Sequence, residues 1–530
     1  MRKIRTAPAE VWSEYEHLKT YNNHTGLYET VKQNENFYIG KQWEGVNAPD
    51  LDKPVVNILK RVVAYFLSNI VSDDVSARVT VGNDDDLVGT TITQTISQVI
   101  ENTKMKAKNR DMLRNSAVDG DGCFYINFDP EAGQQADENR VGGDIDIELI
   151  DNTNILFGNP QVCDVQKQPY IIISMRKMLD DVKDEAEGNG LPTDAITPDN
   201  TDAQILGSDY EDTNKITVLL KLWKQNGTIH AVKTTQGATI KEDTDLGLKL
   251  YPVAWMAWEK VKNSYHGQAA ITGLIPNQIF INKLFAMGME HVKKTAFPKV
   301  VFNEALLPDG WNNRVGEAIP VQGDPNVAVM SATHVPDMSN QVMVMLDKVI
   351  DYTRDTMGAS DAALGNIRPD NTSAIIAVQK ASAMPLELQR MSFYQFVEDV
   401  VRILLDVMRV NFGVRQIVVD DENGNKSLVD FDFANIGNLE LQLNVDVGAS
   451  TYWSELMNVQ TLDNLYTKGI ITDAVTYIES MPDGYIPNKQ KIIAKLKEAQ
   501  AQQEMLAQMQ AEQQMGGMPD AALPQMPNGA

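Results

Sequence analysis

Acidic side chains between residues 119 and 148 come nearest to a chemical site in this sequence. Asp119 and Asp121 alternate with glycines, and a second set alternates with apolar residues at Asp144, Asp146 and Glu148. Carboxylate oxygens of this kind could hold a divalent cation and support a metal-dependent reaction. The same patterns also suit a turn before a strand and a solvated strand face, and no glutamate closes a twelve-residue loop as in an EF-hand. A metal-dependent enzyme therefore stays an alternative, while we expect no metal and no cofactor.

Motifs for other common chemistries are missing from the sequence. It contains no GxxxxGK[ST] loop, no GxGxxG, no HExxH and no GxSxG. The six histidines are scattered without metal-ligand spacing, and Cys123 and Cys163 are too few for a disulfide or zinc framework. We therefore expect two free thiols in a reducing compartment and a protein that is not an enzyme.

The composition points to a protein of several domains with an acidic surface. The chain has 530 residues, 43% of them hydrophobic, and a formal net charge of −25. It lacks an apolar run of about 18 residues, so no membrane span is expected, and acidic residues follow the basic N-terminus where a signal peptide needs apolar ones. A general DNA binder tends to be basic, because neutralising phosphates drives its affinity. The acidity suits either ordinary solubility or a surface that DNA passes without sticking.

The centre of the chain shows the clearest organisation. Apolar residues at helical spacing predict two long helices over about 271–295 and 339–357. The segment between them, residues 297–336, is rich in proline and glycine. Two helices around a compact insert are typical of a stalk with a tip, which indicates that function depends on shape and assembly.

The flanking regions predict an α+β fold that is predominantly helical. Helices are expected over residues 7–32, 52–72, 87–117 and 373–412, with Pro54 in the first turn of the second and Pro385 kinking the last. Strands are expected over 77–81, 124–128, 144–150, 170–175, 216–223, 228–234, 250–259, 416–419, 427–432 and 439–447. Asn226-Gly227 is a strong hairpin signal. Residues 181–214 suggest a surface excursion, 451–500 short helices, and the Gln- and Met-rich end a loose tail.

Basic residues gather in the central segment of this acidic chain. They are Lys283, Lys293, Lys294, Lys299 and Arg314. If the helices line a passage, these side chains could touch DNA phosphates transiently. They could equally pair with Glu290 and Glu304 or with another subunit.

Short motifs follow one another in a fixed order along residues 25–495. They are Asn34–Trp43, Lys53–Asn57, Tyr265–Gly267, Ile275–Gln278 with Asn282, Gly358–Asp361, Leu364–Asn366, Thr372–Ala374, Gly448–Ser450 and Pro482–Pro487. Together they resemble the tailed-bacteriophage portal protein family, the head-to-tail connector at one capsid vertex. The resemblance implies a portal fold with wing, stem, clip and crown.

The family's domains carry over by segment. The resemblance implies a wing over 1–270, stem helices over 271–296 and 338–357, and a clip over 297–337. It also implies a tunnel loop and helix over 358–384, a return to the wing over 385–450, a crown over 451–500 and a disordered tail over 501–530. The tunnel-loop residues expected to face DNA are Ser360, Asp361, Asn366, Arg368, Asp370 and Asn371.

The resemblance also implies function and partners. A homo-oligomeric ring, a dodecamer in the family, would conduct double-stranded DNA during packaging and ejection. It would bind the terminase large subunit, head-completion and tail adaptor proteins, and major capsid and scaffolding proteins, but no membrane. It would be assembled in the host cytoplasm and reside in the virion. Another capsid-linked structural protein, such as an adaptor or a scaffold, is the remaining alternative.

Overall fold

The computed structural model describes most of the chain in two compact units. The described residues are 4–49, 51–70, 76–81, 86–134, 142–199, 214–296, 300–310, 318–332, 340–356, 384–420, 426–438, 441–446, 452–471, 473–481 and short stretches within 486–497. The first unit comprises residues 1–419 and 428–449, and the second comprises 420–427 and 450–530. The first unit is α+β, as the sequence predicts, and holds both larger sheets.

The N-terminal region corrects two predicted helices. The helix expected over 7–32 is two helices, α1 (Pro8–His24) and α2 (Leu27–Ile39), because Gly26 takes a left-handed φ of 75° between them. The helix expected from residue 52 begins later, as α3 (Ile58–Ile70), so Pro54 is not in its first turn. Residues before α3 are held by side chains of a distant helix, and the Asn57 carboxamide oxygen accepts from Lys60 N–H at 3.0 Å.

A three-stranded antiparallel sheet with the order β3-β2-β9 occupies the centre of the first unit. It comprises β2 (Asp121–Gln134), β3 (Gly143–Ile150) and β9 (Val253–Ala257). The single helix expected over 87–117 is divided into α4 (Asp86–Asn102) and α5 (Met105–Asp119), with Lys104 between them at a φ of 53°. The sheet and α5 share one large apolar core with α3 and with α12 (Glu387–Asn411).

The second sheet is antiparallel, has five strands and follows the chain order. Its strands are β4 (Ile155–Phe157), β5 (Tyr170–Met178), β6 (Lys215–Gln225), β7 (Thr228–Thr234) and β8 (Thr239–Asp245). Asn226 and Gly227 join β6 to β7 with φ angles of 54° and 94°, which confirms the hairpin. The strands β4 and β8 were not expected. Part of the expected excursion is helical, as α6 (Leu179–Gly188), which packs against β5 and β8.

A buried ion pair fastens α1 to this sheet. The ammonium group of Lys221 on β6 is buried, bonds the Glu14 carboxylate, and donates to the Arg5 carbonyl oxygen at 2.7 Å. It also lies 4.8 Å from the centre of the Tyr170 ring. Burial lowers the pKa of Lys221, and Glu14 opposes this shift. Each charged group of the pair therefore offsets the cost of burying the other.

Replacing Glu14 by alanine is expected to destabilise the first unit by about 3 kcal/mol, because an unpaired ammonium group stays buried. The double variant Glu14→Leu with Lys221→Met should recover most of this loss, since it removes both charges. Denaturant unfolding of the full chain measures both. Equal stability of the single variant and the wild type would contradict the role given to the pair.

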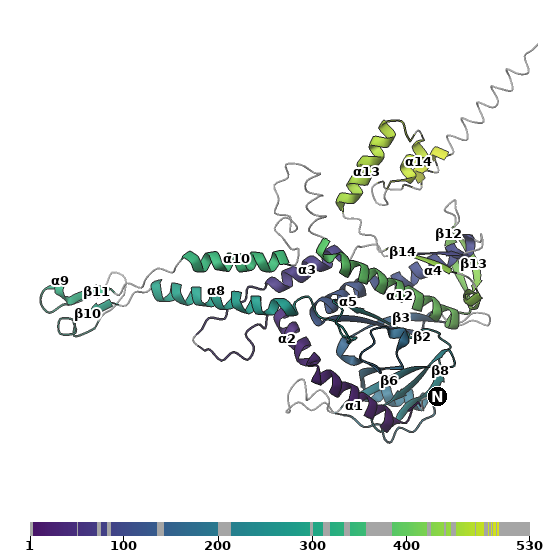
Figure 1. Cartoon of the computed structure of the whole chain (residues 1–530), viewed down its shortest axis with the longest axis horizontal. Coiled ribbons are helices and arrows are strands. Elements are labelled where there is room, and N and C mark those ends of the chain that lie inside the picture. The colour runs from purple at the N-terminus through teal and green to yellow at the C-terminus, as the bar shows by residue number, and fades with distance from the viewer. Residues whose placement is uncertain are drawn as a thin grey trace, which may run out of the picture. The chain divides into compact units, whose positions relative to one another are not determined.

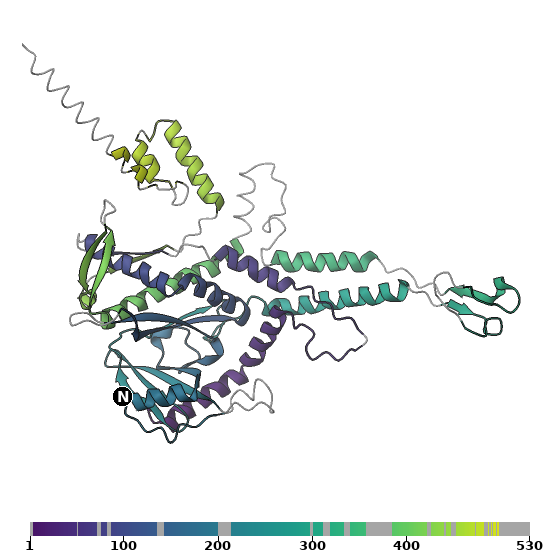
Figure 2. The ribbon, with the colours of Figure 1, turned by 180° about the vertical axis from the view of Figure 1, so that it is seen from behind.

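The two long helices of the central segment are α8 (Ile275–Ala296) and α10 (Asn340–Thr356), which confirms both helices predicted there. Figures 1 and 2 show them side by side, extending away from the two sheets, and they contact each other and α3. The insert between them contains β10 (Val300–Phe302), α9 (Pro325–Ala328) and β11 (Val329–Ala332), with β10 and β11 paired antiparallel.

After the central helices the chain first returns to the first unit and then enters the second. A 3₁₀ turn, Met384–Leu386, precedes α12, so Pro385 lies at its start and no kink arises within the described helix. The predicted hairpin is confirmed as β12 (Val414–Asp420) and β13 (Lys426–Asp432). The strand β14 (Leu441–Asp446) pairs instead with β1 (Ser76–Val81), far back in the chain. The described helices of the second unit include α13 (Tyr452–Thr467) and α14 (Ala474–Glu479).

The remaining short helical turns are of the 3₁₀ type. They are Asn152–Asn154, Val165–Lys167, Thr272–Leu274 and Phe433–Asn438.

Candidate functional site

Buried amide side chains anchor the first half of α8 to the body of the first unit. Gln278 accepts from the Ile58 N–H at 3.1 Å and donates to the Val56 carbonyl oxygen at 2.6 Å. Asn282, one turn further, accepts from Gln278 at 3.0 Å and donates to Gln42 at 2.6 Å. Both amides are almost fully buried, so each bond is made in a low-dielectric setting where an unmade bond is costly. The base of α8 is therefore held in one position.

The helix α10 is fastened to α8 by a polar contact and a small apolar seam. Asn277 donates to the Thr353 hydroxyl at 3.2 Å, and Thr353 donates to the Val349 carbonyl oxygen at 2.7 Å. Leu346 of α10 and Ile281 of α8 belong to one buried apolar cluster, and Leu284 of α8 packs against it.

Many apolar side chains of α8 and α10 are exposed, on more than one side of each helix, and together we call them the helix-pair surface. They are Phe280, Phe285, Met287, Met289 and Val292 on α8, and Met343, Val344, Met345 and Tyr352 on α10. Val344, Met345 and Tyr352 also line a shallow groove along α10 of about 500 Å³. Exposed apolar groups in such number on adjacent helices mark an interaction surface.

The carboxylates considered for metal binding lie in two separate places. The strand register sets Asp144 opposite Asp129, whereas Asp121 begins β2 eight residues earlier. At ~3.4 Å per residue, Asp121 therefore lies about 27 Å along β2 from the position that Asp144 faces. Asp146 pairs with Lys108 at 3.2 Å. Within the described residues no three potential ligands come together for a metal ion. The joint site that a metal-dependent enzyme would need is therefore not formed there.

Asp121 belongs to a buried polar cluster that the sequence did not reveal. Its carboxylate lies 2.8 Å from His266 Nδ1 and accepts from the Gly267 N–H at 2.7 Å and from Asn152 at 3.4 Å. Burial raises the pKa of Asp121, and these three partners oppose that shift. The cluster ties the start of β2 to the segment that leads into α8.

Asp119 lies beside this cluster and is less well compensated. Burial raises the pKa of Asp119 to about 7, and the Arg114 guanidinium, which is paired with Glu35, opposes the shift. One Asp119 carboxylate oxygen is buried and has no hydrogen-bond partner among the described residues. The sequence spacing of Asp119 and Asp121 could not reveal this polar cluster. Its member His266 is 145 residues from Asp121 in the chain.

A family profile for phage P22-like portal proteins matches residues 215–528. The match spans more than half of the chain. This chain belongs to the P22-like phage portal protein family. No curated protein sequence matches it.

Membership explains the absence of catalytic motifs, since the portal family is structural and associates with the virion capsid. The matched residues include α8, α10, α12 and the insert, together with most of the motifs behind the resemblance. The described helices of this portal protein include none with the length and apolarity that crossing a bilayer requires.

The basic residues proposed to touch DNA have different surroundings in the portal protein. Lys293 pairs with Asp52, and Lys294 pairs with Glu290 at 2.7 Å. Both lysines stay more than half exposed, so each pair contributes only about 1 kcal/mol or less. Lys283 is exposed and has no ion-pair partner among the described residues. Lys299 and Arg314 lie outside the described residues.

The residues expected in the tunnel loop also lie outside the described residues. These are Ser360, Asp361, Asn366, Arg368, Asp370 and Asn371. Their role in the portal protein stays a prediction.

Proposed function

We propose that this portal protein assembles into a ring of identical subunits at one capsid vertex. The ring conducts double-stranded DNA during packaging and ejection. It also provides the docking platform for the terminase large subunit, for head-completion and tail adaptor proteins, and for capsid and scaffolding proteins. A homododecamer is the number that the family resemblance implies.

The helix-pair surface is the observation that supports the ring. Its apolar side chains lie on helices that are already packed against each other, so a second copy of the chain is a natural partner for them. Removing a side chain of this size from water contributes about 1.5–3 kcal/mol. A ring closes when each subunit presents one surface to the next by rotation. The anchored base of α8 would keep this surface at a constant angle in every subunit.

Segment roles follow from the same proposal. Residues 271–296 and 338–357 would form the stem, 297–337 the clip, and 1–270 with 385–450 the wing. Residues 358–384 would supply the tunnel loop, 451–500 the crown and 501–530 the tail. The sequence has no nucleotide-hydrolysis loop, which fits a conduit driven by a separate terminase.

The acidic net charge of the chain favours a role in which DNA passes along the protein over one in which DNA is bound tightly. The chain carries 72 acidic and 47 basic residues. Acidic surfaces repel phosphates over a Debye length of about 8–10 Å, which keeps DNA mobile in a passage. The exposed lysines of α8 would offer brief contacts without holding the DNA.

Measuring the mass of the purified full chain tests the proposal. We expect a single large oligomer at micromolar concentration, and electron microscopy should show a ring with a central channel. A stable monomer at that concentration, or particles without a channel, would contradict the conduit.

A further inference from the structure

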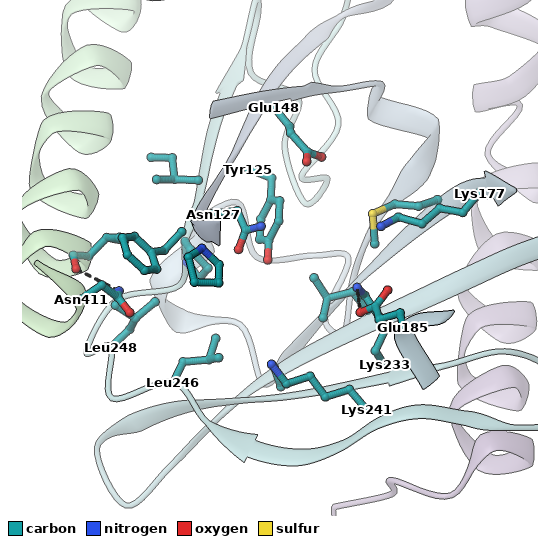
Figure 3. Close-up of a pocket in the computed structure, with 18 residues that line it drawn as sticks. Tyr125, Asn127, Glu148, Lys177, Glu185, Lys233, Lys241, Leu246, Leu248 and Asn411 are labelled. Carbon is teal, nitrogen blue, oxygen red and sulfur yellow. Dashed lines mark hydrogen bonds and ion pairs between the residues drawn. The ribbon is translucent and has the colours of Figure 1, made fainter. Parts of the chain in front are cut away.

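A cavity of about 460 Å³ lies between the two sheets of the first unit. The strands β2 and β3 line one side of it, residues of β5 to β8 and helix α6 line the other, and residues of α12 and of the segment 246–252 complete the lining. Figure 3 shows the Tyr125 hydroxyl and the Asn127 carboxamide directed into it from β2. Its volume is within the range of sites for small organic ligands.

Three lysines from three strands border this cavity: Lys177 on β5, Lys233 on β7 and Lys241 on β8. Lys233 and Lys241 lie directly opposite each other in the strand register. Like charges in that relation destabilise a sheet unless a counter-charge offsets them. Burial lowers the pKa of Lys233, Glu185 opposes this shift, and the nearby charges of Lys177 and Lys241 add to it.

One counter-charge is already in place. Glu185 on α6 binds the ammonium group of Lys233. Among the described residues no carboxylate lies within ion-pair distance of Lys177 or Lys241. The second carboxylate of the lining, Glu148, projects from β3 on the opposite wall (Figure 3). The lysine side of the cavity therefore has two ammonium groups, on half-buried Lys177 and exposed Lys241, without a carboxylate partner among the described residues.

The rest of the lining is apolar or can form hydrogen bonds. Phe128, Pro130, Leu246 and Leu248 supply carbon surface. Tyr125, Asn127 and Glu148 offer groups that can bond to amino or hydroxyl groups of a ligand. A ligand that suits both sides has an anionic end, a flat or apolar middle and a polar edge.

We propose that this cavity binds a small phosphate-bearing molecule of the nucleoside phosphate class, with its phosphates at Lys177 and Lys241. Its base lies against the apolar surface, and its hydrogen-bond donors face Asn127 and Glu148. The phosphate oxygens supply counter-charges to these two lysines, for which the described part of the chain shows no carboxylate partner. The site is separate from the helix-pair surface and does not require the ring.

Calorimetric titration of the full chain tests the site, with ATP and sodium tripolyphosphate as probes in metal-free buffer. We expect ATP to bind with a Kd below about 1 mM. The double variant Lys177→Gln with Lys241→Gln should weaken ATP by about tenfold or more, because charge-assisted bonds are lost. Lys224→Gln, an exposed lysine of the same sheet outside the cavity, is the matched control and should leave ATP affinity unchanged.

Several results would overturn the proposal. They are the absence of ATP binding, equal loss in the control and the double variant, and unchanged affinity in the double variant. Tripolyphosphate binding as tightly as ATP would overturn the role given to the base and the opposite wall. Particle mass, recorded on the same samples, reports ring assembly independently, so failure of the site is distinguishable from failure of the ring.

Discussion

Val344→Asp is expected to separate the assembled particle into smaller species. Val344 is 49% exposed in the single chain and lies in the groove along α10. In a ring, aspartate at this position would lose the apolar contact and place an unpaired charge in the interface. Together these effects amount to about 3 kcal/mol or more for each interface, which weakens association by about a hundredfold. Mass measurement across a dilution series gives the result directly.

A matched control separates assembly from the added charge. Asn23→Asp introduces the same charge at an exposed position at the end of α1, so it should assemble like the wild type. Thermal unfolding should confirm that both variants are folded. If Val344→Asp assembles as well as Asn23→Asp, this face of α10 does not meet a neighbouring subunit.

Asp119→Asn is expected to stabilise the protein at pH 8 and to have little effect near pH 4. Burial raises the pKa of Asp119 to about 7 in the folded chain, above its ordinary value of 3.8. Between these values the folded state binds the proton and the unfolded state does not. The free energy of unfolding therefore falls as pH rises from about 4 to 7, by at most about 4 kcal/mol. Asparagine has no proton to lose, so it avoids this loss.

Denaturant unfolding at several pH values checks the expectation. The quantity to compare is the difference in unfolding free energy between the variant and the wild type at each pH. Burial also raises the pKa of Asp121, so the stability of both proteins falls with pH for that second reason. Asp151→Asn is the matched control. The Asp151 charge contributes to the raised pKa of Asp119, but Asp151 itself is exposed, so its removal tests the loss of a nearby charge without the loss of a buried one. Parallel pH profiles for Asp119→Asn and the wild type would show that Asp119 is not held in its neutral form.

Local sequence patterns were sufficient to predict a helix, strand or hairpin whose formation depends mainly on its own residues. The alternation of Ile145, Ile147 and Leu149 with acidic residues predicted β3, and the two helices of the central segment were found within a few residues. Asn226-Gly227 predicted its hairpin, because few other residue pairs accept a positive φ at both positions. The ordered motifs indicated the portal family, which the family profile confirms.

Breaks in helices were not visible in the same patterns. The apolar spacing continues through Gly26 and Lys104, yet the chain turns at both residues. The start of α3 is set by Gln278 and Asn282, more than two hundred residues away, which bind the backbone that would otherwise form the first turn. Periodicity describes one helix face and contains no information on such distant hydrogen-bond partners.

The sequence by itself determined the class of fold, the position of the helix–insert–helix segment and the family. Only the tertiary structure decided that β1 pairs with β14, that Asp121 meets His266, and that three lysines border one cavity. The reason is physical. Helix and hairpin propensities act between residues a few positions apart, whereas desolvation and charge pairing depend on which distant segments the packed core brings together.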